Sequence, residues 1–516
     1  MAENEKTVVE TKGGKVKGRH QDGLYLFKGI PYAAPPVGKR RWMPPEPVEP
    51  WTGVRPALEF GKVAPQNALS IPFLEALHMD EPQDEDCLYL NIWSPGLDDA
   101  RRPVLVWIHG GAFNMGSGSQ LPYNGSKFAV RGNAVVVTIN YRLGPLGFLN
   151  LNEVTAGSFP ATGNEGLLDQ MAALGWVRDN IAAFGGDPDN VTVFGESAGG
   201  MSIGCMMAMP SARGLFHKAI LQSGVGSTAV TREMAVRVAE QFLKVVGLGP
   251  KDVDALRALP VERLLSADME LRVRMAGPGE MARVTVTAPV IDGKVLPVVP
   301  LEAIKQRSAA NVPVLAGTNL EEWKLFGMMD PDIAKLDEAG MVKRLQFFIP
   351  PEFVPGLVGA YRNARTKRGQ ATTPFELLSA ILTDLMFRVQ ALRVIEAQHR
   401  QGAPSYNYLF TWKSPAMGGI LGACHVLEIG FVFGIYNDAF CGSGPAADRL
   451  SQSIQDAWLA FARAGNPSCK SLGKWPPYGD QRITMILDKE CHTQEAPYED
   501  ERRAWDLVPE LASRNL

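Results

Sequence analysis

The sequence predicts an α/β fold with a mostly parallel central sheet that carries helices on both faces. Residues 104–108, 135–139 and 191–194 are continuous apolar runs rich in β-branched side chains, which is typical of buried strands. An amphipathic helix is predicted at 167–182, between the last two runs, and Gly185 follows its end. Strands that alternate with helices run parallel in one sheet, because each helix carries the chain back to the starting edge.

The segments before and after this region are also patterned. Short antiparallel strands are predicted at 7–27, and the proline-rich stretch 29–51 is predicted to lie over the surface as a loop. The later elements are helices at 231–246, 252–259 and 374–399 and strands at 312–315, 406–410 and 483–487. No repeat or low-complexity linker divides the chain. We therefore interpret residues 1–516 as a single elaborated domain with helical insertions at about 225–310 and 325–400.

Composition excludes several classes of protein. Lys+Arg 52 against Asp+Glu 55 gives a net charge of −3, which excludes binding to nucleic acid or to anionic membrane by bulk charge. No run of about 18 apolar residues predicts a membrane span. The six cysteines form no C-x-x-C pair, so neither a zinc site nor a disulfide framework is expected. With no apolar segment at the N-terminus either, we expect a cytoplasmic protein.

The strongest local motif is Gly-Glu-Ser-Ala-Gly at 195–199, directly after the third buried run and before an apolar stretch that is predicted to be helical. A nucleophile on a tight turn from strand to helix needs small residues two positions before and after it. Gly195 and Gly199 meet this requirement. The motif therefore predicts Ser197 as a nucleophile, and its context makes an incidental serine in a glycine turn the weaker interpretation.

A second glycine-rich motif, His-Gly-Gly-Ala-Phe at 109–113, follows the strand predicted at 104–108. Acyl transfer needs backbone N–H groups that point at the developing oxyanion, and a glycine-rich turn exposes such groups. A third donor is expected from the N–H of Ala198, just after the nucleophile. A turn that merely needs positive φ is the alternative, but the two motifs stand in the order expected of one fold.

A serine nucleophile needs a base, and sequence context favours His425 among the seven histidines. It lies in a loop flanked by glycine and apolar residues, after the strand predicted at 406–410. The others precede the nucleophile, belong to the oxyanion turn or lie in unsuitable contexts: His20, His78, His109, His217, His399 and His492. The acid that orients this base should come between the nucleophile and the histidine. Glu321 and Glu322 both follow the strand at 312–315, and position alone does not separate them.

Taken together, the motifs resemble the type-B carboxylesterase family, which includes the cholinesterases and the bacterial p-nitrobenzyl esterases. The resemblance covers nearly the whole chain. Besides the two glycine motifs and His425, it rests on Phe27 to Ala33, Glu85 to Asn91, Phe184 to Pro188, Asp292 with Gly293, Gly465 to Pro467 and Trp475 with Pro476. The family implies an α/β-hydrolase fold with helical insertions around an active-site gorge.

Carried over residue by residue, the resemblance implies a nucleophile, an acid and a base at Ser197, Glu322 and His425. It implies oxyanion donors at Gly111, Ala112 and Ala198, with supporting roles for Gly110, Glu196 and Ser202. The family usually has glycine after its acid, whereas this chain has Trp323, so Glu321 stays an alternative for the acid.

The implied function is a serine carboxylesterase that works through an acyl-enzyme and acts broadly on small to medium uncharged esters. Such a mechanism requires no metal and no organic cofactor. The expected partner is a small-molecule ester, with no nucleic acid and no membrane span, and the sequence leaves the oligomeric state open. A carbamate or amide hydrolase of the same mechanism is an alternative, because only the leaving group and the pocket differ. A second alternative is a binding protein that keeps the fold without catalysis.

Overall fold

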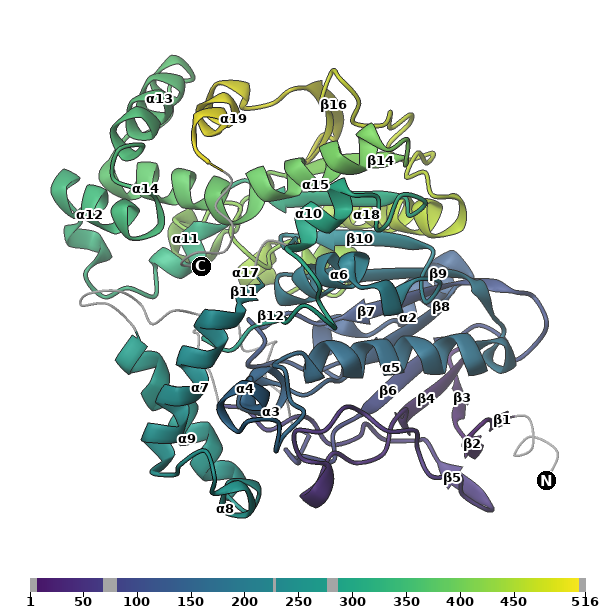
Figure 1. Ribbon diagram of the computed structural model, residues 1–516. Coiled ribbons are helices and arrows are strands. Elements are labelled where there is room, and N and C mark those ends of the chain that lie inside the picture. The colour runs from purple at the N-terminus through teal and green to yellow at the C-terminus, as the bar shows by residue number, and fades with distance from the viewer. Residues whose placement is uncertain (1–6, 68–80, 226–228, 276–285, 510–516) are drawn as a thin grey trace.

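The computed structural model describes residues 7–67, 81–225, 229–275 and 286–509. Within these ranges, eleven strands form one sheet in the order β16-β15-β14-β13-β10-β9-β7-β8-β6-β4-β3 (Figure 1). The strands are β3 (Arg19–Gln21), β4 (Leu24–Pro31), β6 (Tyr89–Ser94), β7 (Arg102–Ile108), β8 (Val135–Ile139), β9 (Gly186–Glu196), β10 (Lys218–Gln222), β13 (Val314–Asn319), β14 (Ser405–Phe410), β15 (Ile483–Leu487) and β16 (His492–Glu495).

The middle of this sheet is parallel and its two ends are antiparallel. All pairings from β8 through β7, β9, β10, β13 and β14 to β15 are parallel. The strands β6, β4 and β3 at one end and β16 at the other run antiparallel to their neighbours. The predicted mostly parallel sheet is therefore confirmed, and the three predicted buried runs lie within β7, β8 and β9.

Helices cover both faces of the sheet, as Figure 1 shows. The first face carries α5 (Glu165–Asn180), α6 (Ala198–Ala208), α10 (Pro300–Lys305) and α15 (Val389–Arg400), and the second carries α2 (Ser126–Gly132), α16 (Ile429–Phe433) and α18 (Pro445–Ala464). Strand β7 connects the two layers. Its Val104, Val106 and Ile108 pack into the first layer, whereas Leu105 and Trp107 pack into the second. A strand buried on both sides needs apolar residues throughout, which explains the continuous run in the sequence.

Two groups of helices beyond the sheet form apolar clusters of their own. One cluster contains residues of α7 (Arg232–Val246), α8 (Val253–Arg257) and α9 (Val261–Met275), and the other contains residues of α12 (Glu338–Phe348), α13 (Val354–Lys367) and α14 (Pro374–Thr383). A π-helical turn, Asp384–Arg388, joins α14 to α15. The remaining helices are α3 (Gly144–Phe148), α4 (Leu151–Val154), α11 (Trp323–Gly327), α17 (Asp438–Cys441) and α19 (Glu499–Ala504). The single-domain organisation stays a prediction.

The N-terminal region differs from its prediction in one respect. As predicted, β1 (Val8–Thr11) and β2 (Gly14–Lys17) pair antiparallel. A strand that was not predicted, β5 (Val54–Pro56), pairs parallel with β2. The short strands β11 (Val230–Thr231) and β12 (Val290–Ile291) form a separate pair. The proline-rich stretch is not wholly a surface loop, because Ile30, Tyr32 and Trp42 are buried. The indole N–H of Trp42 donates to the Pro145 carbonyl at 2.8 Å, so the large ring is buried without an unpaired donor.

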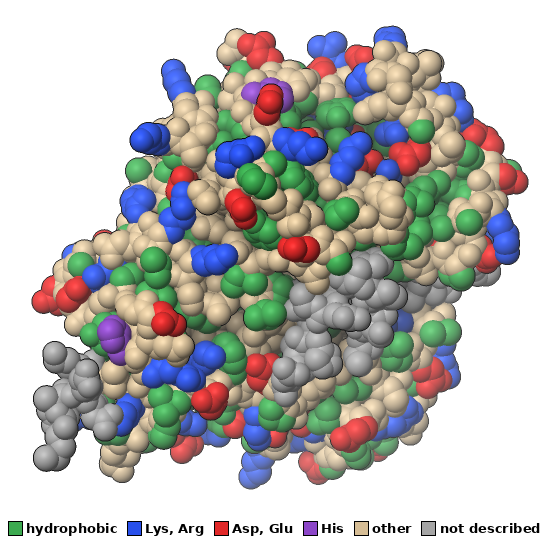
Figure 2. Space-filling view, turned by 180° about the vertical axis from the view of Figure 1, so that it is seen from behind, with side chains coloured by type: hydrophobic (Ala, Val, Ile, Leu, Met, Phe, Trp, Pro, Cys, Tyr) green, Lys and Arg blue, Asp and Glu red, His purple; other side chains and the backbone are tan. Residues whose placement is uncertain are grey.

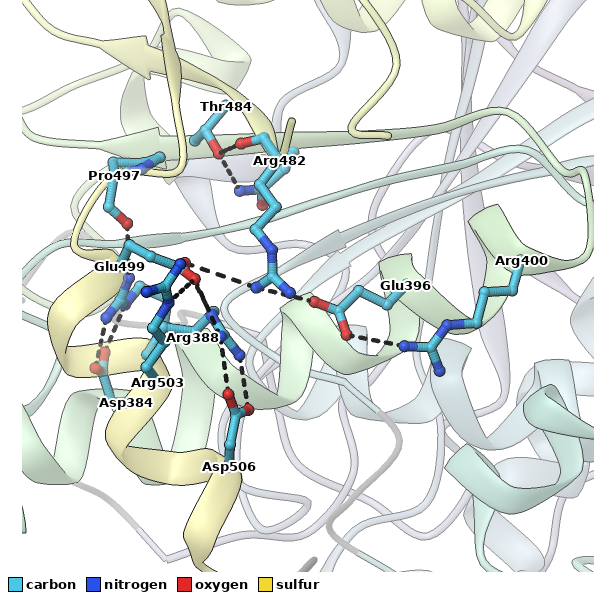
Figure 3. Close-up of polar contacts among 12 residues, drawn as sticks. Asp384, Arg388, Glu396, Arg400, Arg482, Thr484, Pro497, Glu499, Arg503 and Asp506 are labelled. Atoms are coloured by element: carbon cyan, nitrogen blue, oxygen red, sulfur yellow. Dashed lines mark hydrogen bonds and ion pairs between the residues drawn. The ribbon is translucent and has the colours of Figure 1, made fainter. Parts of the chain in front are cut away.

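The C-terminal helix α19 is attached to the body of the protein by charge (Figure 3). Arg482, beside β15, connects the helix to the body, because it lies 3.7 Å from Glu499 on α19 and 3.3 Å from Glu396 on α15. Within α19, Glu499 also pairs with Arg503 at 2.9 Å. The Glu499 carboxylate also pairs with Arg502. Figure 2 shows the face opposite to that of Figure 1, where acidic and basic side chains are interspersed. No helix within the described ranges is long and apolar enough to cross a membrane.

Candidate active site

The Gly-Glu-Ser-Ala-Gly motif forms a sharp turn between β9 and α6. β9 ends at Glu196, α6 begins at Ala198, and Ser197 between them has φ 53° and ψ −122°. This strained backbone presents the half-buried Ser197 side chain at the carboxyl edge of the sheet. The turn is held on both sides, because the Ser197 N–H donates to the Gln222 carbonyl at 2.9 Å and its carbonyl accepts from the Met201 N–H at 2.9 Å.

The glycines of the motif allow the turn to lie against β7. A Cβ added at Gly195 would lie 2.6 Å from the carbonyl oxygen of Ile108, and one added at Gly199 would lie 2.0 Å from the same oxygen. Both distances are far below van der Waals contact, and the obstacle is backbone. The spacing of small residues that predicted a nucleophile is thus required by the close approach of two chain segments.

We expect Gly199→Ala to lower the free energy of unfolding by about 3 kcal/mol, because overpacking against rigid backbone is costly. Gly175→Ala is the matched control. Gly175 lies on α5 with no heavy atom within 4 Å of an added Cβ, so this change should raise the unfolding free energy by about 0.5–1 kcal/mol. Urea denaturation of both variants measures the difference. Equal effects at the two positions would contradict the steric explanation.

The second glycine motif lies beside the serine turn. Ile108 and Gly195 are paired in neighbouring strands, so the turn that follows β7 meets the turn that follows β9. A Cβ added at Gly110 would be 3.2 Å from the Cβ of Ser197. In this turn Gly111, Ala112 and Phe113 all have positive φ, at 104°, 53° and 63°. The predicted oxyanion donors are therefore in the same neighbourhood as Ser197.

His109 stabilises this turn through its ring and its backbone carbonyl. Its ring stacks on Tyr141 with centroids 4.4 Å apart, its Nδ1 lies 2.9 Å from the Gly110 carbonyl, and Tyr141 donates to the His109 carbonyl at 2.9 Å. Burial lowers the pKa of His109 to about 4. The imidazole is consequently neutral at physiological pH, and its Nδ1–H donates to Gly110.

His425 lies in the loop between β14 and α16, and its Nδ1 contacts Glu322 Oε2 at 2.7 Å. Glu322 follows β13 and is completely buried. Its other oxygen, Oε1, accepts from the Asn319 N–H at 2.7 Å. A carboxylate held in this way fixes which ring nitrogen of His425 carries the proton and leaves Nε2 available.

The free nitrogen of His425 faces a second carboxyl group. Nε2 lies 3.1 Å from Glu196 Oε1, one residue before Ser197 in the chain. Burial by itself lowers the pKa of His425, but Glu196 and Glu322 outweigh burial and raise it to about 9. Burial raises the pKa of Glu196 well above its usual value. Phe326 and Phe387 flank the imidazole, each with its ring centroid 5.0 Å away.

Sequence reasoning did not single out Glu428, a buried carboxyl group that helps to raise the pKa of His425. Glu428 accepts from Asn319 Nδ2 at 2.6 Å and from Gln222 Nε2 at 3.2 Å, and burial raises its pKa to about 7. Its only signal in the sequence is its place three residues after His425. Within the described ranges, no group of three or more His, Cys, Asp or Glu side chains is arranged to hold a metal ion.

Several residues that the sequence analysis considered for the site make their contacts elsewhere. Ser202 is buried but its Oγ accepts from Gln170 Nε2 at 3.1 Å, so its contact is with α5 and not with Glu196. Ser202 lies on the second turn of α6, which faces α5. Glu321 contacts the Ala423 N–H and Lys324 instead of His425. His217 accepts from the Val191 N–H through Nδ1, and His78 lies outside the described residues.

Comparison with known proteins decides the family. The model of the carboxylesterase family matches residues 5–505. The chain belongs to the carboxylesterase family. It is 41% identical over 507 residues to the para-nitrobenzyl esterase of Bacillus subtilis, which covers 96% of this chain and 98% of the relative. It is 36% identical over 495 residues to the phenmedipham hydrolase of Pseudarthrobacter oxydans, covering 94% of this chain and 95% of that one.

Solved structures agree. A carboxylesterase of Geobacillus stearothermophilus superposes with a TM-score of 0.85 at 41% identity, over 97% of this chain and all (100%) of that one. A thermophilic PNB esterase superposes with a TM-score of 0.84 at 38% identity, over 97% of this chain and 99% of that one. The fold is thus that of the α/β-hydrolase carboxylesterases, and this carboxylesterase is a carboxylic ester hydrolase. The alternative of a non-catalytic binding protein is therefore set aside.

Proposed function

We propose that this carboxylesterase hydrolyses esters through a triad of Ser197, His425 and Glu322. The 2.7 Å contact between His425 Nδ1 and Glu322 Oε2 carries the proposal, because it holds the proton of the neutral ring on Nδ1 and leaves Nε2 as the nitrogen that accepts a proton. In the first step Ser197 Oγ attacks the ester carbonyl, and its proton passes to Nε2. The alcohol then leaves with that proton, and the acyl group stays on Ser197.

The negative charge of the tetrahedral intermediate would be stabilised by three backbone donors, the N–H groups of Gly111, Ala112 and Ala198. This assignment is supported by the close approach of the two turns, at Gly110 and at Ser197. Preorganised donors of this kind contribute strongly because they need no rearrangement as charge develops. Water then attacks the acyl-enzyme with His425 again as base. This sequence uses no metal and no organic cofactor.

The proposed substrates are small to medium uncharged esters, with broad specificity. The aromatic wall of Phe326 and Phe387 beside His425 suits apolar groups and limits the access of water to the imidazole. Carbamates and amides are the alternative, since the same triad serves them. Substrates that share a p-nitrophenol leaving group, one an acetate and one an N-methylcarbamate, separate the two. A cytoplasmic location stays a prediction.

Labelling with a fluorophosphonate tests the proposed nucleophile. We expect one phosphonyl group per chain, on the peptide that contains Ser197, and loss of p-nitrophenyl butyrate hydrolysis in proportion to labelling. Protein unfolded in urea before labelling serves as the control and should take up no label, because the activated serine depends on the folded site. Labelling of another residue, or full activity in the labelled enzyme, would refute the assignment.

A further inference from the structure

We infer that Glu321 is a positioning residue that holds the loop bearing His425 in its working orientation, and that Lys324 and Glu376 hold Glu321 in turn. The inference rests on the proposed function of His425 as the base. It gives a task to the acidic neighbour of Glu322, which does not contact the imidazole.

Glu321 binds the loop at two points. Its backbone N–H donates to the Ala423 carbonyl at 2.9 Å, and its carboxylate oxygen Oε2 accepts from the Ala423 N–H at 2.9 Å. Ala423 lies two residues before His425. One residue further along, the His425 N–H donates to the Glu322 carbonyl at 3.4 Å. The backbone of the loop is therefore fixed to the segment that carries Glu322. A shift of either segment displaces the other.

Gly422 shows how closely the loop lies on the carboxylate. This glycine has φ 56°, and a Cβ added there would lie 2.0 Å from Glu321 Oε2. The chain thus has no space for a side chain at position 422 while Glu321 occupies its site. This close fit indicates that the Glu321 carboxylate makes a specific contact with the loop and is not simply a solvated surface charge.

A chain of ion pairs fixes the carboxylate from the other side. Lys324 Nζ lies 2.7 Å from Glu321 Oε1 and 2.9 Å from Glu376 Oε1. Glu376 is in turn 2.8 Å from Arg365 Nη2. These residues come from α11, α14 and α13, so the chain of charges runs from the helical insertion to the loop of His425.

The two central groups of this chain stay charged near neutral pH. Burial by itself raises the pKa of Glu321, but the Lys324 ammonium outweighs it and the pKa lies below its usual value. Burial by itself lowers the pKa of Lys324, but Glu321 and Glu376 outweigh it and the pKa lies above its usual value. The side chain of Lys324 is only 9% exposed, so its removal leaves the Glu321 charge buried with weaker compensation.

The test compares Glu321→Ala, Glu321→Gln and Lys324→Met with p-nitrophenyl butyrate from about pH 5 to 10. We expect Glu321→Ala to reduce kcat about 30-fold with KM within about twofold, because a small misplacement of the base is costly while substrate contacts remain. Glu321→Gln keeps an acceptor for the Ala423 N–H and should restore most of kcat, to within about fivefold of wild type. Lys324→Met should fall between the two.

The pH profile separates positioning from a general loss of structure. In Glu321→Ala we expect His425 to lie farther from Glu196 and Glu322, the carboxyl groups that raise its pKa. Weaker contact with these carboxylates lowers the pKa of His425, so the acid limb of kcat/KM should move to lower pH. Asp268→Asn is the matched control, because Asp268 is buried and paired with Arg272 at 2.8 Å on α9, outside the cavity that Glu321, Lys324 and Glu376 line. Its kcat and pH profile should remain those of the wild type.

Two results would overturn the inference: wild-type kcat and pH profile in Glu321→Ala, or equal losses in Glu321→Ala and the control. If Glu321→Ala does not fold, as judged by circular dichroism, an unchanged kcat and pH profile in both Glu321→Gln and Lys324→Met overturns it equally. His425→Gln keeps the two hypotheses apart. Activity in His425→Gln refutes the proposed function, whereas an inactive His425→Gln beside a fully active Glu321→Ala refutes only the role of Glu321.

Discussion

Ser197→Ala is expected to reduce kcat for p-nitrophenyl butyrate by at least about 10⁴-fold, because the change removes the hydroxyl group that the proposed mechanism acylates. KM has little meaning for the residual reaction, so single-turnover measurements with excess enzyme are preferable. The wild-type enzyme should release a burst of p-nitrophenol when acylation is faster than deacylation, and the variant should show none.

The control for this experiment is another buried serine. Ser405, at the amino end of β14, is fully buried and donates to the Ala403 carbonyl at 3.0 Å. Ser405→Ala should keep kcat within about twofold, because it changes one local hydrogen bond far from the carboxyl edge of the sheet. A comparable kcat in Ser197→Ala and in the wild type would remove the nucleophile from the proposed mechanism.

Glu322→Gln is expected to reduce kcat by about 10³- to 10⁴-fold with the fold intact. The amide that replaces the carboxylate can present its NH₂ group to Nδ1 of His425, which favours the tautomer in which Nε2 already carries a proton. It also removes a negative charge that stabilises the imidazolium. Stopped assays over the full pH range measure the loss, and the unfolding transition shows whether the variant is folded.

Glu321→Gln is the matched comparison for this variant, since it makes the same chemical change one residue earlier. Its loss should be about fivefold, because the amide oxygen can still accept from the Ala423 N–H. A larger loss in Glu321→Gln than in Glu322→Gln would reverse the assignment of the acid. The structure favours Glu322, because of these two neighbouring glutamates only Glu322 has its carboxylate in contact with His425, whereas Glu321 contacts Ala423 and Lys324.

The parts of the site that are local in sequence could be predicted. The serine turn requires glycines at fixed spacing, and the structure shows why, since Gly195 and Gly199 both approach Ile108. The choice between Glu321 and Glu322 could not be made in this way. Both glutamates lie in the turn after β13, where no strand alternation fixes the direction of a side chain. The one that reaches His425 is decided by the Asn319 N–H and by the loop at Ala423, which is distant in sequence.

In the fold, too, the elements with a strong local signal were predicted, whereas those that depend on distant residues were not. Strands buried on both faces have a strong apolar signal, and β7, β8 and β9 were predicted from it. The helix predicted at 374–399 is interrupted by the π turn Asp384–Arg388, where Asp384 and Arg388 pair with each other at 2.6 Å. Helices α12 and α13 lie within the helical insertion predicted at about 325–400, but their individual bounds were not predicted. Much of each helix contacts solvent, and only part of each packs into the apolar cluster that α12, α13 and α14 share. Long-range partners decide such elements.

The two ends of the large sheet bear on whether a second copy of the chain can add a strand to it. An edge strand presents unpaired backbone groups, and a long apolar edge recruits a strand from a neighbouring molecule. Here β3 has three residues and β16 has four, and their side chains are polar and largely exposed. Neither edge offers an apolar template, so both oppose strand addition and fibril growth. Even in a concentrated solution, the large sheet is therefore not expected to extend from one molecule into the next.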